Sequence, residues 1–320
     1  MYLTASQVDF FNNQGYLVIE RFWTNDVVDE LRSRIKHILD TLDLSDPSAG
    51  SVFTTNDQVR KSDDYFLNSG RNISFFWEER AFDEDGKLRN QPQESINKIG
   101  HGLHDFEAGF ERVSYDERVG NICLDLGIVI PTIVQSMYIF KQAYVGGEVG
   151  AHQDGAFLYT EPQTCLGLWW ALDDCHKENG CLWAVPGSHR LPVRRRFCRR
   201  SAADNPNEKQ CGTVWKKSAD AGSDLTFDPT KPEQWDLSTA VPLIIPRGSL
   251  VLLHHALVHY SEGNFSPTAR HAYSIHIVDG KSSIVYPGDN WLQPTLDRPF
   301  RAFPAKATVA RCEDETKGIA

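Results

Sequence analysis

The sequence predicts a β-rich α+β fold, in which helices flank an all-β sandwich or barrel. After residue 130, short apolar runs of strand-like composition follow one another, and Gly, Pro, Asn and Asp separate them. No helix-sized pattern lies between most of these runs, which argues against a doubly wound α/β sheet. No internal repeat is evident. We therefore expect one domain over 1–320, with N-terminal helical support over about 1–130, a β core over about 131–280 and an insertion at about 191–241.

The first twenty residues predict a helix followed by a strand. Thr4 or Ser6 can cap the helix, and Gly15 ends it because glycine adopts the left-handed conformation of a helix terminus without strain. The run 16–19 then has the composition of a strand. The apolar positions of the helix are Val8, Phe10 and Phe11.

A second helix is predicted from residue 25 to about residue 42. Thr24 or Asn25 can cap it, and apolar residues recur along one face at helical spacing. We expect this face to pack on the body of the protein, because ordinary surface helices show the same pattern. The apolar face consists of Val27, Val28, Leu31, Ile35, Ile38, Leu39 and Leu42.

Five later runs are predicted to be strands: 133–142, 164–172, 181–185, 249–253 and 272–278. The stretch 191–241 interrupts their spacing and is polar, charged and weakly periodic. Loops of this length are usually functional or mobile. Its arginine cluster has two interpretations, a solvated surface or a clamp for an anionic substrate. The cluster consists of Arg190, Arg194, Arg195, Arg196, Arg199 and Arg200.

The composition is that of an ordinary globular protein, with 41% apolar and 24% charged residues among 320. The net charge of −10 argues against a general nucleic-acid-binding surface. No apolar stretch approaches the roughly 18 residues of a membrane span, and the first residues lack a signal-peptide pattern. Seven cysteines without CxxC spacing support neither a disulfide framework nor a zinc ribbon. We expect a cytoplasmic monomer or weak dimer.

The most informative stretch is a glycine-rich run that ends in His152, Gln153 and Asp154. Residues i and i+2 of a strand point to the same face, so His152 and Asp154 would direct an imidazole and a carboxylate to one point, while Gln153 turns away. Two histidines and one carboxylate form the facial triad that binds Fe(II) and leaves positions open for cosubstrate and O₂. A second histidine is needed to complete such a triad.

Five downstream histidines compete for that position: His254, His255, His259, His271 and His276. His259 is favoured because Arg270 follows it after eleven residues, at the entry to the last predicted strand. The distal carboxylate of a 2-oxo acid such as 2-oxoglutarate needs a bidentate cation of this kind. Ser261 would share the face of His259 and could add a hydroxyl to the same carboxylate. We expect the other four histidines to pack in the core or to support the ligands.

The order of these residues, HxD followed by a distant histidine and an arginine, resembles that of the Fe(II)/2-oxoglutarate dioxygenases. Longer sequence motifs narrow the resemblance to the phytanoyl-CoA dioxygenase family, because residues 178–183 (ENGCLW) and 186–190 (PGSHR) are similar to its sequences. Four further segments resemble one branch of that family: 95–101, 135–142, 152–162 and 290–295. The similarity extends from about residue 6 to about residue 300.

The resemblance implies a double-stranded β-helix core, of the jelly-roll or cupin-like kind, with flanking helices. It implies that the iron ligands are His152, Asp154 and His259. The distal carboxylate of 2-oxoglutarate would be held by Arg270 and Ser261. Further residues expected to line the cosubstrate pocket are Lys98, Met137, Gln153 and Trp169.

Enzymes of this kind use Fe(II), O₂ and 2-oxoglutarate, release succinate and CO₂, and hydroxylate a small molecule. Ascorbate is the expected reductant. Related halogenases have a small residue at the carboxylate position, so Asp154 favours hydroxylation or desaturation over halogenation.

Two departures from the family concern the substrate. Tyr260 stands where the branch has a basic residue, and the insertion is longer and richer in arginine. An anionic or acyl-bearing small molecule is compatible with this region, but its identity is open.

Two other functions are also open: a non-catalytic protein that binds or senses iron and 2-oxoglutarate, and a cupin-like enzyme with another metal. The candidate substrate contacts are Tyr159, Tyr260, Arg194, Arg195 and Arg196.

Overall fold

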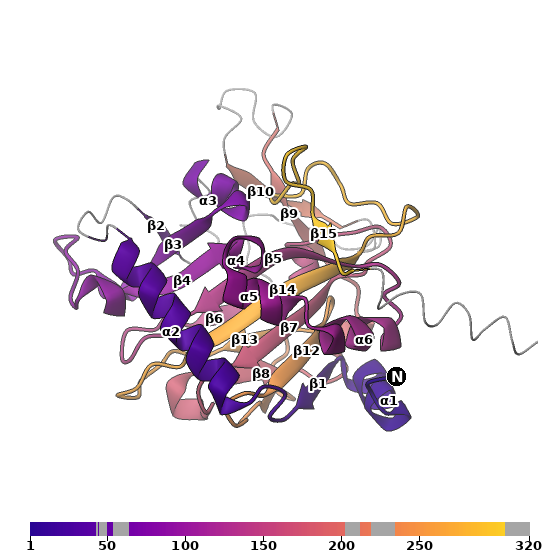
Figure 1. Cartoon of the computed structure of the whole chain (residues 1–320), viewed down its shortest axis with the longest axis horizontal. Helices are drawn as coiled ribbons and strands as arrows, with labels where there is room; N and C mark the ends of the chain where they lie inside the picture. The colour runs from indigo at the N-terminus through magenta and orange to yellow at the C-terminus, as the bar shows by residue number, and fades with distance from the viewer. Residues whose placement is uncertain (43, 45–49, 54–63, 202–211, 219–233, 305–320) are drawn as a thin grey trace, which may run out of the picture.

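The computed structural model describes residues 1–42, 44, 50–53, 64–201, 212–218 and 234–304, and two β-sheets dominate this part of the chain (Figure 1). The larger sheet has nine strands, in the order β1-β12-β7-β14-β5-β4-β3-β2, with β15 beside β5. The smaller sheet has four strands, in the order β11-β8-β13-β6. Neighbouring strands are antiparallel except for the parallel pair β2 and β3.

The strands of the larger sheet are β1 (Tyr16–Ile19), β2 (Ser51–Phe53), β3 (Ile73–Glu78), β4 (Ile96–His101), β5 (Pro131–Ile139), β7 (Leu166–Ala171), β12 (Leu250–His254), β14 (Ala272–Asp279) and β15 (Arg301–Ala302). Those of the smaller sheet are β6 (Val149–His152), β8 (Leu182–Ala184), β11 (Val241–Pro242) and β13 (His259–Ser261). Each strand predicted after residue 130 is present, with its ends shifted by a few residues.

The chain crosses between the two sheets at nearly every step of the β core. Strands β5 and β7 lie in the larger sheet, whereas β6 and β8 lie in the smaller one. The crossing repeats at the C-terminal side, where β11 and β13 belong to the smaller sheet and β12 and β14 to the larger one. As a result, the ends of β6 and β13 lie beside each other and opposite β14.

Helices cover the outer face of the larger sheet (Figure 1). They are α1 (Ala5–Gln14), α2 (Asn25–Thr41), α4 (Leu103–Phe106), α5 (Ala108–Ser114) and α6 (Glu117–Asp125). The short helix α3 (Asp64–Asn68) packs elsewhere, with Phe66 stacked on Trp291 and close to Phe197. Strand alternation divides two adjacent tryptophans between the layers. Trp170 stacks on Trp23 beneath the helices at a centroid distance of 4.5 Å, whereas Trp169 packs between the sheets.

The first helix begins and ends where its capping residues predict. Thr4 and Gln7 form a capping box, and Gly15 ends the helix with a φ of 83°. The predicted apolar face is only partly right, because Phe11 is buried whereas Phe10 is 42% exposed and packs against the Tyr16 ring. Too short to cover a wide face of the core, this helix buries a single large side chain.

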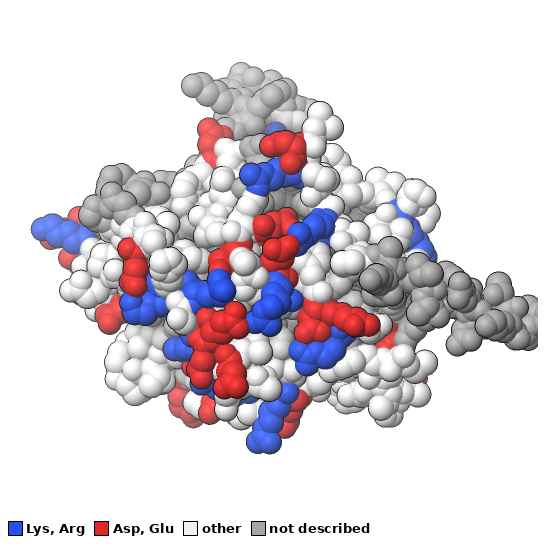
Figure 2. Space-filling model, in the orientation of Figure 1, with Lys and Arg blue, Asp and Glu red and all other residues white. Residues whose placement is uncertain are grey.

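The second helix follows the predicted apolar face closely. Thr24 occupies the N-cap position, although its side chain makes no capping hydrogen bond. Val28, Leu31, Ile35 and Leu39 are buried, and the helix packs on α5 and the outer face of the larger sheet. Its exposed side carries acidic and basic residues in alternation (Figure 2), and Arg34–Glu107 and Arg112–Glu30 ion pairs join it to α5.

Two expectations about the organisation of the chain need correction. The first 130 residues are not only helical support, because β1 forms one edge of the larger sheet and β2, β3 and β4 extend the other. The insertion is not only a loop, because β9 (Arg195–Arg199) and β10 (Thr213–Lys217) form an antiparallel hairpin. The rest of the insertion within 202–211 and 219–233 lies outside the described residues.

Among the described residues, no helix combines the length and the apolar character that crossing a membrane requires.

Candidate active site

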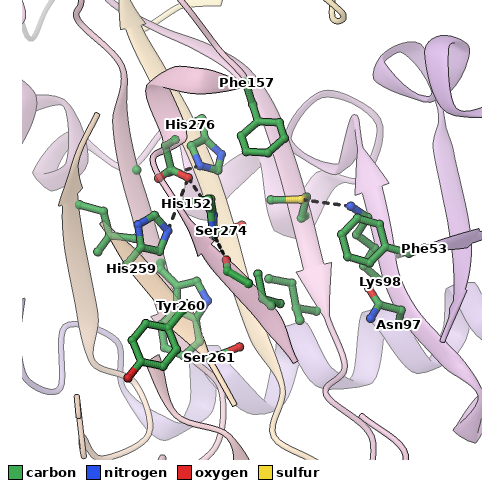
Figure 3. A pocket seen from close by; sticks show the side chains of 18 of the residues that line it. Phe53, Asn97, Lys98, His152, Phe157, His259, Tyr260, Ser261, Ser274 and His276 are labelled. Atoms are coloured by element: carbon green, nitrogen blue, oxygen red, sulfur yellow. Dashed lines mark hydrogen bonds and ion pairs between the residues drawn. The ribbon is translucent and has the colours of Figure 1, made fainter. Parts of the chain in front are cut away.

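Three side chains meet where β6 and β13 lie side by side. His152 ends β6, His259 begins β13, and the two residues are paired across the antiparallel ladder. Asp154 opens the short 3₁₀ turn Asp154–Ala156, which follows the strand after Gln153. The three ligand-type atoms lie within 4.8 Å of one another, and Asp154 Oδ1 is 3.6 Å from Nε2 of each histidine. Figure 3 shows the two rings directed toward this point.

Hydrogen bonds fix which nitrogen each histidine presents. Nδ1 of His152 lies 2.8 Å from the carbonyl oxygen of Gly150, and Nδ1 of His259 lies 3.1 Å from that of Leu257. A ring nitrogen that faces a carbonyl carries the hydrogen, which leaves the Nε2 lone pair of each ring directed at Asp154. Burial lowers the pKa of His259 to about 4, so this imidazole is neutral and able to bind a metal near pH 7.

A third histidine supports the carboxylate from the larger sheet. Nε2 of His276 lies 3.3 Å from Asp154 Oδ2, and Nδ1 of the same ring lies 3.1 Å from Nε2 of Gln135. Burial raises the pKa of the Asp154 carboxyl, but His259 and His276 outweigh it and hold the pKa well below its usual range. His276, which the sequence places among the packing or supporting histidines, supports a ligand and is not a member of the three-residue cluster.

The three-residue cluster lies in a cavity of about 430 Å³ between the two sheets. Of the predicted cosubstrate residues, Lys98, Met137, Trp169, Ser261 and Arg270 line this cavity. Lys98 and Met137 lie on adjacent strands, with the Lys98 ammonium 3.9 Å from the Met137 sulfur and 3.6 Å from the Phe53 ring centroid. Figure 3 shows Lys98 and Phe53 across the cavity from the histidines.

Gln153 does not line the cavity, in contrast to what the family resemblance implies. Its amide is buried and donates to the carbonyl oxygen of Ala256 at 2.8 Å, on the side away from the cluster. This orientation is the one that strand alternation between His152 and Asp154 predicts. Gln153 therefore holds the turn after β6 in place and does not face a cosubstrate.

The far end of the cavity is cationic. Arg270 is 1% exposed, and one guanidinium nitrogen donates to the carbonyl oxygen of Gly180 at 2.7 Å. The other two nitrogens, Nε and Nη1, are buried and have no hydrogen-bond partner among the described residues. The ring of Trp169 lies 5.2 Å from the guanidinium carbon. Buried N–H groups of a cation are costly to leave unpaired, so this end of the cavity is suited to an anion.

The candidate substrate contacts separate into two groups. Tyr260 and Arg195 line the cavity, and their side chains stack on Trp183 and Trp215, respectively. Tyr159, Arg194 and Arg196 do not line the cavity: the Arg196 guanidinium covers the buried Tyr159 ring and pairs with Asp289, and Arg194 lies over Trp235.

The interpretation of the arginine cluster as a solvated surface is wrong for the residues on β9. Arg195 is buried against Trp215, and Arg199 donates to the carbonyl oxygen of Trp291. Both faces of this strand are covered, because the consecutive residues Phe197 and Cys198 point to opposite faces and are both buried. Arg190 precedes the hairpin and is exposed, as a solvated surface requires.

Several residues of the site were not singled out from the sequence. Ser274 and Gln135 line the cavity, and alternation from Arg270 along the last strand could have indicated Ser274. Lys141 also lines the cavity, and its ammonium donates to Ser261 Oγ at 2.8 Å. It follows β5 in an apolar context, where a lysine gives no sign that it is buried.

Known proteins with related sequences extend over nearly the whole chain. The family model for phytanoyl-CoA dioxygenase (PhyH) matches residues 11–272. A phytanoyl-CoA dioxygenase of Arabidopsis thaliana is 42% identical over 303 residues, which cover 94% of this chain and 98% of the relative. Phytanoyl-CoA dioxygenase domain-containing protein 1 of Rattus norvegicus is 41% identical over 302 residues, which cover 93% of this chain and 97% of the relative.

Solved structures of lower identity share the fold. The non-heme α-ketoglutarate-dependent carbocyclase SnoK from nogalamycin biosynthesis has a TM-score of 0.57 at 18% identity, covering 94% of this chain and 97% of its own. EctD from S. alaskensis, solved with 2-oxoglutarate and 5-hydroxyectoine, has a TM-score of 0.56 at 19% identity, covering 96% and 87%. The family match and the relatives of similar length show that this chain belongs to the phytanoyl-CoA dioxygenase family.

Proposed function

We propose that this chain is an Fe(II)- and 2-oxoglutarate-dependent dioxygenase that hydroxylates a small molecule. One observation carries the proposal: a cavity holds a cluster of two histidines and one carboxylate together with a buried guanidinium, two of whose nitrogens have no partner in the part of the chain that the structure describes. A metal cluster alone is compatible with many reactions. The guanidinium adds a binding site for the far carboxylate of a dicarboxylic cosubstrate.

The donor set fits Fe(II). Two imidazole nitrogens and one carboxylate oxygen form the facial set that non-haem Fe(II) oxygenases use, with the opposite positions open. The bonds from Nδ1 to the carbonyls of Gly150 and Leu257 fix the ring orientations, and His276 holds the second oxygen of Asp154. Bound Fe(II) would supply the oxidative decarboxylation of 2-oxoglutarate by O₂, which gives succinate and CO₂ and oxidises a C–H bond of the substrate.

The chain's own residues orient the cosubstrate. Arg270 would donate Nε–H and Nη1–H to the distal carboxylate, and Ser261 lines the same cavity. The Trp169 ring lies next to Arg270 and would cover the apolar middle of the cosubstrate. Lys98 and Met137 close the cavity on the side of β4 and β5.

The strand order supports a double-stranded β-helix as the core. In that fold, consecutive strands alternate between two four-stranded sheets, as β5 to β8 and β11 to β14 do here. Strands β1 to β4 and β15 extend the larger sheet beyond this core. We propose that the jelly-roll core begins at β5 and ends at β14. Its location in the cytoplasm and its monomeric or weakly dimeric state stay predictions.

The cavity favours an apolar substrate that carries an anionic group. Beyond the metal cluster, aromatic rings form its walls, among them Phe157, Trp215 and Trp291. Arg195 lines the cavity beside Trp215. A guanidinium at this wall can donate to an anionic group, and aromatic walls favour an apolar body. The carboxylate at Asp154 favours hydroxylation or desaturation.

The test measures succinate from 2-oxoglutarate with the full chain, Fe(II), O₂ and ascorbate, in the absence and presence of small-molecule fractions from a metabolite extract. We expect at least one fraction to accelerate succinate formation. The Asp154→Ala variant should lose iron and turnover together, and Arg270→Met should raise the KM for 2-oxoglutarate by about 10- to 100-fold through the lost charged hydrogen bonds.

Two results would contradict the proposed catalytic function. A wild-type chain that holds iron and binds 2-oxoglutarate, yet releases no succinate with any fraction, is a binding or sensing protein. A chain that holds a metal but does not bind 2-oxoglutarate supports a cupin-like enzyme without a 2-oxo acid.

A further inference from the structure

Lys141 is a buried cation beside the cosubstrate site that the reaction described above does not use. It follows β5, is 3% exposed and lines the cavity. Its ammonium donates to Ser261 Oγ at 2.8 Å and to the carbonyl oxygen of Gly147 at 2.6 Å. An ammonium has three N–H donors, so these contacts leave one donor for a further acceptor.

Lys141 and Arg270 form a pair of cations at the same end of the cavity. The backbone N–H of Arg270 donates to the carbonyl oxygen of Lys141 at 3.1 Å, which joins the two residues directly. Within the described residues, the hydrogen bonds of both side chains go to uncharged oxygens, and neither side chain forms an ion pair. Two neighbouring buried cationic groups disfavour each other's charge, and a bound carboxylate offsets that cost.

The contact between Lys141 and Ser261 sets the direction of the Ser261 hydroxyl hydrogen. A hydroxyl has one hydrogen, and the ammonium can only donate. Ser261 Oγ therefore accepts from Lys141 and must direct its own hydrogen elsewhere. Arg270 and Ser261 both line the cavity, so a carboxylate bound to Arg270 would be the acceptor for that hydrogen.

The backbone is built to admit this lysine. Lys141 has a φ of 34°, in the left-handed region that side chains other than glycine adopt at a cost. Gly180 packs against it with a φ of 74°, and a Cβ there would lie 2.9 Å from Lys141 Cε. The carbonyl oxygen of the same glycine holds Arg270. The conformation of one glycine thus accommodates both cations.

We propose that Lys141 is a second cationic anchor for the distal carboxylate of the cosubstrate and that it orients the Ser261 hydroxyl toward that carboxylate. The inference rests on the proposed function and adds a further residue that holds its cosubstrate. Arg270 alone would hold the carboxylate; Lys141 and Ser261 complete its shell of donors.

The test is a calorimetric titration of the full chain loaded with Mn(II), which binds such sites without turnover. The two ligands are 2-oxoglutarate and 2-oxopentanoate, which has the same chain length and a methyl group in place of the distal carboxylate. For the wild type we expect tighter binding of 2-oxoglutarate. Lys141→Met should weaken 2-oxoglutarate by about 10- to 100-fold, the range of one or two charged hydrogen bonds, and leave 2-oxopentanoate unchanged.

Two further variants separate the roles. Ser261→Ala should weaken 2-oxoglutarate as well, and the double variant should lose less than the product of the two single losses, because the residues act together. Lys87→Met, which removes an exposed lysine, is the control and should bind both ligands as the wild type does.

Failure of this inference is distinct from failure of the proposed function. If the Mn(II)-loaded wild type binds neither ligand, the proposed function fails. If the wild type prefers 2-oxoglutarate and Lys141→Met keeps the same preference, the role of Lys141 is overturned while the function stands. Should Lys141→Met not fold, Lys141→Gln, which keeps a polar donor but no charge, provides the same comparison.

Discussion

His276 holds the oxygen of Asp154 that faces away from the other two histidines. Its Nε2 lies 3.3 Å from Asp154 Oδ2, whereas Oδ1 is 3.6 Å from Nε2 of both His152 and His259. An imidazole of the larger sheet therefore lies against one oxygen of the carboxylate, and the other oxygen faces the cluster. A supporting group of this kind fixes the orientation of a metal ligand.

Replacing His276 by alanine should weaken metal binding by about 10- to 100-fold, the usual effect of removing a group that supports a ligand. Mn(II) titration followed by electron paramagnetic resonance measures the affinity directly. His254→Gln is the matched control, because His254 is also a histidine of the larger sheet but does not line the cavity. Equal losses in both variants would mean that the effect comes from general destabilisation.

Gly167 gives a second way to disturb the same carboxylate. It lies on β7 beneath Asp154, and a Cβ at this position would lie 2.6 Å from Asp154 Oδ2. The carboxylate is a short side chain held between three histidines, so it must rotate away from its ligand geometry to relieve the contact. Gly167→Ala should reduce Mn(II) affinity by at least about tenfold, as disturbed ligand support does.

The control for this variant is Gly150→Ala, because Gly150 also lines the cavity but a Cβ there meets no atom within 4 Å. An unchanged affinity in Gly167→Ala would show that Asp154 Oδ2 does not need the position that the structure gives it.

Much of the site follows from local sequence patterns. The HxD spacing and the eleven-residue step from His259 to Arg270 predict side chains that the fold brings into one cavity. Strand alternation also predicts that Gln153 turns away from Asp154, and its amide bond to Ala256 agrees. These features depend on residues close together in sequence or on neighbouring strands, which is why a sequence pattern can carry them.

Other features depend on contacts between distant segments, and no local pattern encodes them. The bond from Lys141 to Ser261 joins residues 120 positions apart, and the support of Asp154 by His276 crosses from one sheet to the other. The arginines of the hairpin β9–β10 make its sequence typical of a charged loop. They are nevertheless buried through stacking and ion pairing, as Arg195 is on Trp215. Burial by pairing leaves no trace in composition.

The pH dependence of cosubstrate binding should reveal the charge of Lys141. Burial, followed by the neighbouring Arg270, lowers the pKa of Lys141 to about 7; Glu78 and Glu148 raise it, and Arg80 lowers it. The unfolded chain keeps this proton up to its ordinary pKa near 10.4. Between about pH 7 and 10.4 the unfolded chain therefore binds more protons, and the free energy of unfolding of the ligand-free chain should rise with pH.

A carboxylate bound beside Lys141 favours the charged ammonium, so 2-oxoglutarate should be bound with uptake of a proton above pH 7. Calorimetry at pH 8.5 in two buffers of different ionisation enthalpy measures this uptake. We expect it in the Mn(II)-loaded wild type and its loss in Lys141→Met. Identical uptake in both proteins would assign the proton to another group.

The charge at the substrate end of the cavity predicts a preference among probe ligands. Arg195 lies 3.6 Å over the Trp215 ring, and the Phe157 ring next to Trp215 reaches the metal-ligand candidate His152. An apolar ligand along this wall would place an anionic group near Arg195. The chain loaded with Mn(II) and 2-oxoglutarate should therefore bind 4-phenylbutyrate about 10- to 100-fold more tightly than its neutral amide, as expected for a charged hydrogen bond.

Arg195→Met should remove this discrimination between acid and amide, because the aromatic wall is kept and the charge is lost. Arg194→Met is the matched control: its guanidinium lies over Trp235, and Arg194 does not line the cavity, so the preference should stay at the wild-type value. Competition calorimetry with both probes gives the ratio for each protein. A wild type that binds the acid and the amide equally well would contradict an anionic substrate. If both variants lose the preference for the acid, the preference comes from the overall charge of the hairpin and not from Arg195.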